Sequence, residues 1–235
     1  MFDFLLNEEG RIAKRQRVLT DKAQTADERE SAIAWLAGNG SPKAVVALLS
    51  RFDLTLEHQI NDKTEKQRVY DVLVELGADA VGRALRAHLR KCRQVGWPLK
   101  LLSATEASAA LPLVIELLEA EARKHDFKPE RKVDLLSWLS DHKDPRAIDA
   151  AAPLLTDFDE GVRCAAVAAI VAQPEDRGKT SLEAKLVDPK EDSNRLKVRI
   201  LSAFVQRRWR VADAEAVQAN LPPGYSLRDG IILGS

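Results

Sequence analysis

Four arginines with helical spacing are the residues of this sequence best suited to bind a ligand. They follow one another at intervals of 3, 4 and 3 residues: Arg83, Arg86, Arg90 and Arg93. Residues three or four apart share one face of a helix, and guanidinium groups form bidentate contacts with phosphate and carboxylate groups. The spacing predicts a helix over residues 80–93 with a basic face for a phosphate backbone, an acidic protein segment or an anionic lipid headgroup.

The basic face has a second interpretation, in which the fold itself neutralises it. The next long helical pattern carries Glu116, Glu119 and Glu121, which are within reach of the arginines if neighbouring helices stack. Paired in this way, the arginines would stabilise the fold and bind nothing else. The sequence leaves both interpretations open.

A second basic cluster includes an aromatic residue. Its members are Arg195, Lys197, Arg199, Arg207, Arg208 and Arg210, with Trp209 among the last three. Basic residues beside an exposed aromatic side chain can bind nucleic acid through phosphate contacts and base stacking. However, Trp209 continues an apolar helical stripe that begins at Val198. The spacing therefore favours a Trp209 packed in the core.

The remaining reactive residue types have structural explanations. Residues 157–163 contain three carboxylates without the ligand order of a calcium loop, and these acids suit capping of a helix that includes Arg163. The histidines lie singly in different segments, with His88 expected at a core or boundary position. Cys92 and Cys164 lie among apolar residues and predict no disulfide. We therefore expect no metal site, no cofactor and no catalytic centre, unless distant segments assemble one in space.

Helices in a repeating order must position these residues. Apolar landmark residues recur every 28–38 residues, at Leu36, Leu73, Leu101, Leu139, Ile170 and Leu201. Polar turns separate the helical patterns, with Gly40 and Gly77 suited to end a helix and Pro145 suited to begin one. The hydrophobic fraction is 45% but aromatic residues are only 5%, as is typical of amphipathic helices. The pattern predicts an all-α protein.

The repeats divide the chain into three parts. Residues 1–25 are expected to form an amino-terminal cap helix, residues 26–222 a solenoid, and residues 223–235 a capping tail. The solenoid would contain six helix pairs, at about 26–53, 64–94, 97–126, 128–157, 158–189 and 193–222. Asp229-Gly230 between short apolar runs predicts a hairpin in the tail. The polar stretch 54–64 fits either an ordered loop or a mobile insertion.

One unit resembles a known repeat family. Its residues match the pattern D-x-x-V-R-x-x-A-x-x-A-[LI]: Asp159, Val162, Arg163, Ala166, Ala169 and Ile170. This resembles the signature of HEAT repeats, particularly the short bacterial and phycobilisome-lyase-like kind. The match is good over 135–170, partial over 26–53 and 64–90, and weak over 97–126. The resemblance implies an α-α superhelix over most of the chain, but no single function, because HEAT units occur in scaffolds, lyases and nucleic-acid enzymes.

Charge and hydropathy narrow the function. The 36 basic and 36 acidic residues give zero net charge, so any binding of nucleic acid or membrane must use a local patch. The apolar run at residues 1–6 is too short for a signal peptide, and no segment approaches membrane-spanning length. We therefore expect a cytoplasmic, non-enzymatic scaffold or adaptor that binds a partner protein, with Arg83, Arg86 and Arg90 as contacts.

The resemblance leaves two alternative functions. One is a nucleic-acid-binding protein similar to the alkylbase DNA glycosylases, which are helical and of similar size. The other is a bilin-lyase-like or cofactor-chaperone role. The sequence predicts neither the identity of the partner nor the oligomeric state.

Overall fold

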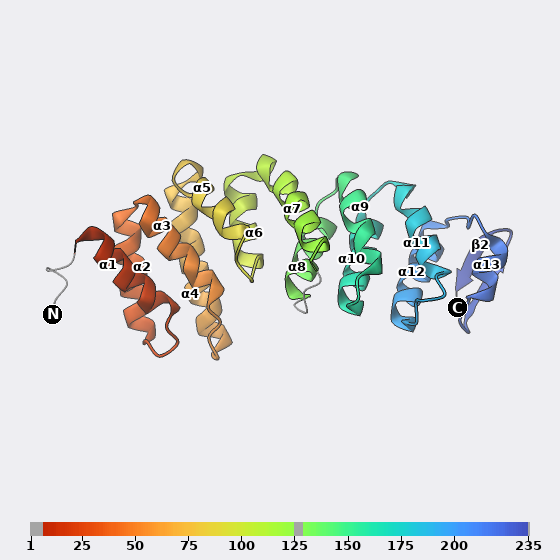
Figure 1. Ribbon diagram of the computed structural model, residues 1–235, viewed down its shortest axis with the longest axis horizontal. Helices are drawn as coiled ribbons and strands as arrows, with labels where there is room; N and C mark the ends of the chain where they lie inside the picture. Colours follow the sequence, from red (N-terminus) through yellow and green to blue (C-terminus); the bar gives the residue numbers. More distant parts are fainter. Residues whose placement is uncertain (1–6, 125–128, 235) are drawn as a thin grey trace. The chain divides into compact units, whose positions relative to one another are not determined.

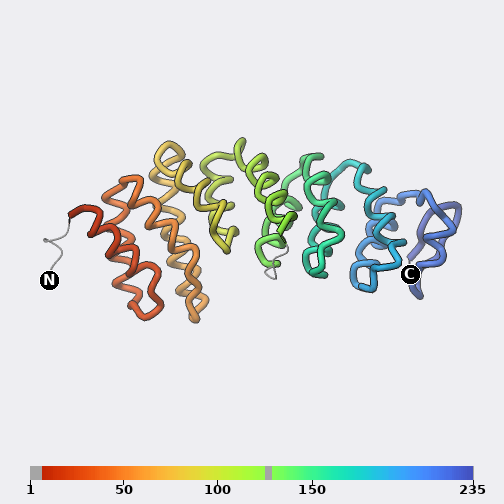
Figure 2. The backbone as a smooth tube through the Cα atoms, viewed as in Figure 1, coloured from red at the N-terminus to blue at the C-terminus, as the bar shows by residue number. Residues whose placement is uncertain are grey.

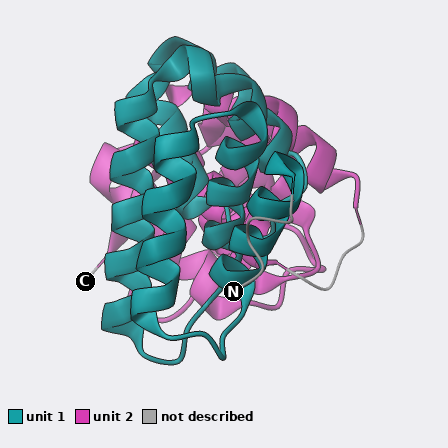
Figure 3. Cartoon of the chain, turned by 90° about the vertical axis from the view of Figure 1, so that its left-hand side faces the viewer, with its two compact units in different colours: residues 1–113 teal, residues 114–235 magenta. Residues whose placement is uncertain are grey.

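The computed structural model describes residues 7–124 and 129–234, and most of its regular elements are helices (Figures 1 and 2). The all-α prediction is confirmed. The chain forms two compact units, residues 1–113 and 114–235 (Figure 3). The expectation for the amino-terminal apolar run concerns residues 1–6, which lie outside the described residues, as do 125, 126 and 128 of the predicted helix pairs and Ser235 of the predicted tail.

The first unit consists of a leading helix and successive helix pairs. Its elements are α1 (Glu8–Thr20), α2 (Ala26–Asn39), α3 (Pro42–Leu49) with the 3-10 turn η2 (Ser50–Asp53), α4 (Gln59–Leu76), α5 (Ala78–Leu89), α6 (Gly96–Thr105) and the start of α7 (Ala107–Ala122). α2 packs against α4 and α4 against α6, whereas α3 packs against α5. The first helices of the pairs therefore lie side by side, and the second helices form another layer. α1 covers α2 and α3 at the beginning of this arrangement.

The second unit repeats the pairing. After the end of α7 it contains α8 (Glu130–Ser140), α9 (Arg146–Ala151), η3 (Ala152–Thr156), α10 (Glu160–Ala172), η4 (Asp176–Gly178), α11 (Lys179–Leu186), α12 (Asn194–Arg207) and α13 (Ala214–Ala219). α10 packs between α8 and α12. The first helix of the predicted pair 64–94 begins earlier than expected, at Gln59, and the division of the chain into six stacked pairs stays a prediction. A continuous superhelix through the whole chain stays a prediction.

The landmark residues of the sequence form the centres of the two cores. Leu36, Leu73 and Leu101 are fully buried in the first unit, and Leu139, Ile170 and Leu201 are buried in the second. Burial of such aliphatic side chains is the main favourable contribution to folding. Within residues 7–124 and 129–234, no helix combines the length and the apolar character that crossing a bilayer requires.

Local signals explain where the helices begin and end. Thr25 and Glu28 form a reciprocal capping box at the start of α2, which satisfies amides that have no partner within the helix. Gly40 ends α2 with a φ of 60°, and its amide bonds to the Leu36 carbonyl. Asp159 caps α10 by accepting a hydrogen bond from the Val162 amide at 3.0 Å, so the capping interpretation of residues 157–163 is confirmed.

The predicted hairpin is also confirmed. β1 (Tyr225–Arg228) and β2 (Ile231–Gly234) pair antiparallel with Arg228 opposite Ile231. Asp229 and Gly230, which connect them, have φ values of 51° and 75°, as a two-residue type I′ turn requires. β2 packs on α12, and the Val211 amide bonds to the Gly230 carbonyl. The hairpin thus covers part of the surface of α12.

Gly38 in α2 and Gly40 at its carboxyl-terminal cap should respond in opposite ways to substitution by alanine. Gly40→Ala should cost about 1 kcal/mol of unfolding free energy, because alanine is strained at positive φ. Gly38 lies inside the helix with open space around it, so Gly38→Ala should stabilise by about 0.5–1 kcal/mol. Urea unfolding followed by tryptophan fluorescence measures both. If both substitutions changed the unfolding free energy in the same direction, Gly40 would not have the left-handed backbone conformation assigned to it at the end of α2.

Candidate functional site

α5 carries the predicted basic face, but the helix ends earlier than predicted. It stops at Leu89, and Arg90 forms its carboxyl-terminal cap. The amides of Lys91 and Cys92 both bond to the carbonyl of His88, which tightens and closes the last turn. The predicted helix over 80–93 is therefore wrong at its end, and Arg93 lies in the loop before α6 rather than on the face with Arg83 and Arg86.

Arg86 is neutralised, although not by the predicted carboxylates. It forms an ion pair with Glu106, at the end of α6. A Cβ atom at Gly82 would overlap the Glu106 carboxylate, so the absence of a side chain at Gly82 allows this carboxylate to approach α5. Glu121 instead pairs with Lys124 and Arg131 at 2.8 Å. Glu116 and Glu119 are exposed on the part of α7 that belongs to the second unit.

Four further residues of α5 and its carboxyl-terminal cap are exposed. They alternate alanine and arginine: Ala80, Arg83, Ala87 and Arg90. We call these four residues the α5 basic face. Among residues 7–113, the described part of the first unit, no carboxylate forms an ion pair with Arg83. Because alanine is short, a partner backbone can come close to α5 between the two arginines.

The first unit also contains a buried ion network that the sequence analysis missed. Arg29 of α2 and Arg51 of η2 both contact Glu65 of α4, with Nε–Oε2 distances of 2.9 Å. Arg51 also contacts Asp62 at 2.9 Å, and its side chain is fully buried. Three elements separated in sequence thus meet at one carboxylate. Residue spacing could not reveal this network, because its members lie in three different elements, α2, η2 and α4.

The same network orders the polar stretch 54–64. Residues 54–58 form a loop, and α4 begins at Gln59. The Leu56 amide donates to Asp62, and Arg51 donates to the Leu54 carbonyl. Burial acts to raise the pKa of Asp62, but hydrogen bonds from Lys66, Arg51 and the Leu56 amide outweigh it and hold that pKa below its ordinary value. The stretch is therefore an ordered loop followed by the first turns of α4.

A second charge cluster lies beside a surface hollow of about 660 Å³ in the second unit. Glu191 contacts Arg163 at 3.0 Å and Lys185 at 2.8 Å, and its side chain is 1% exposed. Burial acts to raise the pKa of Glu191, but the hydrogen bonds from Lys185, the Ser193 amide and Arg163 outweigh it and lower that pKa. Asp157, on the same hollow, pairs with Lys132. These charges are matched within the fold.

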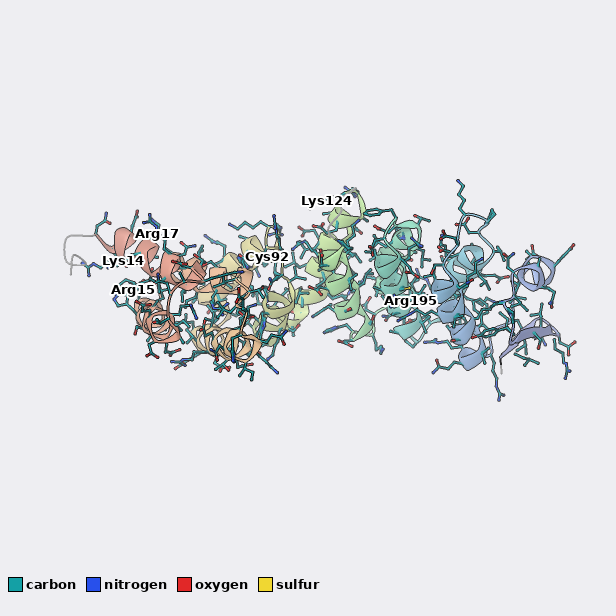
Figure 4. The ribbon with its side chains drawn as sticks, turned by 90° about the horizontal axis from the view of Figure 1, so that it is seen from below. Lys14, Arg15, Arg17, Cys92, Lys124 and Arg195 are labelled. Carbon is teal, nitrogen blue, oxygen red and sulfur yellow. The ribbon has the colours of Figure 1, made fainter. Side chains whose placement is uncertain are left out.

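The second basic cluster does not offer an aromatic side chain for stacking. Trp209 is 5% exposed, packs edge-on against Phe204 at 5.3 Å between ring centroids, and donates to Asp176 at 2.7 Å. Its predicted place in the core is confirmed. Arg207 binds the carbonyls of Val171 and Gln173 at the end of α10. Arg195, at the start of α12, is labelled in Figure 4.

One group of side chains with metal-binding chemistry comes together in the first unit. Asp53, His88 and Cys92 place one possible ligand atom each within 4.8 Å of the others. His88 is buried, as expected for a core or boundary residue. The sequence analysis treated the histidine and the cysteine separately, although they are one helical turn apart, and Asp53 comes from the preceding helix pair.

The buried network predicts a large effect at Glu65. Glu65→Ala should lower the unfolding free energy by about 3–5 kcal/mol, because it leaves Arg29 and Arg51 buried without their shared carboxylate. Glu30→Ala is the matched control, since it removes the exposed ion pair with Arg68 and should cost less than about 1 kcal/mol. Urea unfolding at neutral pH compares them. Equal losses would show that the network does not stabilise the first unit.

The lowered pKa of Glu191 predicts a pH-dependent contribution to stability. A carboxylate whose folded pKa is depressed stabilises the fold above its ordinary pKa, here 4.5, and loses that effect as the pH falls further. Glu191→Gln should therefore destabilise the protein by about 3 kcal/mol at neutral pH, with the difference from wild type shrinking below pH 4.5. Urea unfolding at a series of pH values measures it. A difference independent of pH would contradict the assigned ion pairs.

Comparison with known proteins found no matching family model, no matching curated protein and no matching solved structure. The resemblance to HEAT repeats therefore stays a hypothesis that depends on the residues of the chain itself.

Proposed function

We propose that this protein is a non-enzymatic, HEAT-like scaffold or adaptor of the cytoplasm, and that it binds an acidic segment of a partner protein through the α5 basic face. The observation that carries this proposal is the exposure of Arg83 beside Ala80 and Ala87 on one side of α5, with the exposed Arg90 at its carboxyl-terminal cap. Opposite charge on a partner would direct it to this face. The chain as a whole has zero net charge, so the attraction would be local.

The packing of the helix pairs supports a binding role for α5. α5 belongs to the layer of second helices in its unit and packs beside α3. α3 leaves Val46 45% exposed, so an apolar side chain is available on the neighbouring helix. Arginine with adjacent apolar surface is a composition typical of protein interfaces.

Two observations favour a protein partner over nucleic acid. The α5 basic face supplies two arginines, with Arg93 nearby in the loop, whereas proteins that track a DNA backbone make about 6–10 phosphate contacts. In the second basic cluster, Trp209 is buried and bonded to Asp176, so it cannot stack on a base. We therefore favour an acidic protein segment as the ligand.

The double variant Arg83→Glu/Arg90→Glu tests this function. Affinity capture from a nuclease-treated cytoplasmic extract, quantified by mass spectrometry, should identify a protein whose recovery falls at least about tenfold with the variant. Binding of the purified chain to an acidic segment of that protein should fall equally in fluorescence anisotropy. Arg86 is left unchanged, because its ion pair with Glu106 belongs to the fold.

The matched control is Arg17→Glu/Lys22→Glu, which reverses the same number of exposed charges on and after α1. It should leave capture and peptide binding unchanged, and circular dichroism should show that both double variants keep their helices. If no captured protein depends on Arg83 and Arg90, the α5 basic face is not the contact surface. If duplex DNA binds instead and is lost with the first variant, the nucleic-acid alternative replaces this proposal.

A further inference from the structure

The end of α5 meets the end of η2 at a point where three potential metal ligands face one another. Asp53 is the last residue of η2, His88 lies in the last turn of α5, and Cys92 follows one helical turn later. Their ligand atoms all lie within 4.8 Å of one another. His88 Nε2 is 3.7 Å from Asp53 Oδ1.

We propose that Asp53, His88 and Cys92 form a binding site for a divalent transition metal of the zinc class. Zinc takes nitrogen and oxygen ligands at about 2.0–2.2 Å and sulfur at about 2.3 Å in a tetrahedron, so neighbouring ligand atoms are separated by about 3.3–3.8 Å. The distance between His88 and Asp53 already lies in this range. The other ligand atoms, which all lie within 4.8 Å of one another, would have to move closer together on binding.

The ligand types identify the class of metal. An imidazole together with a thiolate suits zinc, cobalt or copper, whereas magnesium and calcium prefer sites made of oxygen atoms alone. Three protein ligands leave the fourth tetrahedral position for water, as in open zinc sites. The Asp53 side chain is 43% exposed, so solvent reaches the site from its side.

Two of the three ligands are already fixed by the fold. His88 and Cys92 are 6% and 5% exposed, and the Cys92 amide bonds to the His88 carbonyl at 2.9 Å. Asp53 follows Arg51, which the contacts with Glu65 and Asp62 hold in place. Preorganised ligands reduce the conformational entropy that metal binding would otherwise cost.

Metal binding at this site would release a proton from the cysteine. The Cys92 Sγ atom lies 3.9 Å from the Leu89 carbonyl oxygen, as a weak thiol donor. A zinc ion replaces the thiol proton, the Zn–S bond forms on the resulting thiolate, and the proton passes to solvent. The positive charges of Lys66 and Lys91 act on Asp53 and would oppose binding of a cation there. The charge of Lys66 is balanced by Asp62, 2.8 Å away.

Cobalt titration of the tag-free, chelator-treated full chain tests the proposal. Wild-type protein should bind one Co²⁺ per chain, with thiolate-to-cobalt charge-transfer absorption and the visible bands of tetrahedral cobalt, and Zn²⁺ should displace it. Cys92→Ala should abolish the charge-transfer absorption. Asp53→Asn, at an exposed side chain, should keep the thiolate signal and weaken affinity at least about tenfold.

The other buried cysteine provides the matched control. Cys164 is 3% exposed in the second unit, so Cys164→Ala tests the loss of a buried thiol elsewhere and should bind cobalt as the wild type does. Zn²⁺ should raise the unfolding temperature of the wild type and of Cys164→Ala but not of Cys92→Ala. Absence of a thiolate band in wild type, its survival in Cys92→Ala, or wild-type affinity in Asp53→Asn would overturn the proposal.

Discussion

Each amphipathic helix pair has an apolar face that it cannot cover by itself, and this constraint governs both units of the protein. Burial is achieved by stacking, with α4 between α2 and α6 in the first unit and α10 between α8 and α12 in the second. Because every pair presents similar aliphatic side chains, burial alone does not specify how neighbours align. The identity of the neighbour and its alignment require additional, directional contacts.

Buried ions supply such contacts. Glu65 joins Arg29 of the preceding pair to Arg51 at the end of that same pair, and Glu191 joins the start of α10 to the end of α11. Removing charges from water is costly, so such groups contribute less to net stability than their short distances suggest. Their geometry is nevertheless exacting, because a displaced helix would leave several charges buried without partners. In this protein the ion networks therefore specify which segments are neighbours, which the similar apolar faces of the helices do not.

Sequence patterns predicted the features that arise from local interactions. Periodic leucines identified the buried positions, Gly40 marked the end of α2, and Asp229-Gly230 marked the hairpin turn, because each depends on residues adjacent in the chain. The end of α5 was missed, since bonds to one carbonyl closed the helix before its apolar pattern stopped. The pairing of Arg86 with Glu106 and the meeting of Asp53 with His88 depend on how helix pairs stack. The spacing of residues along one helix does not show which residues of another helix pair they will contact.

Gly82 has a consequence for the charge of the protein surface. The Glu106 carboxylate occupies the space that a side chain at this position would fill, and from there it neutralises Arg86. A single methyl group at Gly82 would force the carboxylate to move and would so alter its ion pair with Arg86, beside the exposed Arg83. The strength of the local electric field on this side of α5 is thus set by a residue that has no charge and no side chain. Small steric changes at such a position can retune the surface for a different partner without replacing any charged residue.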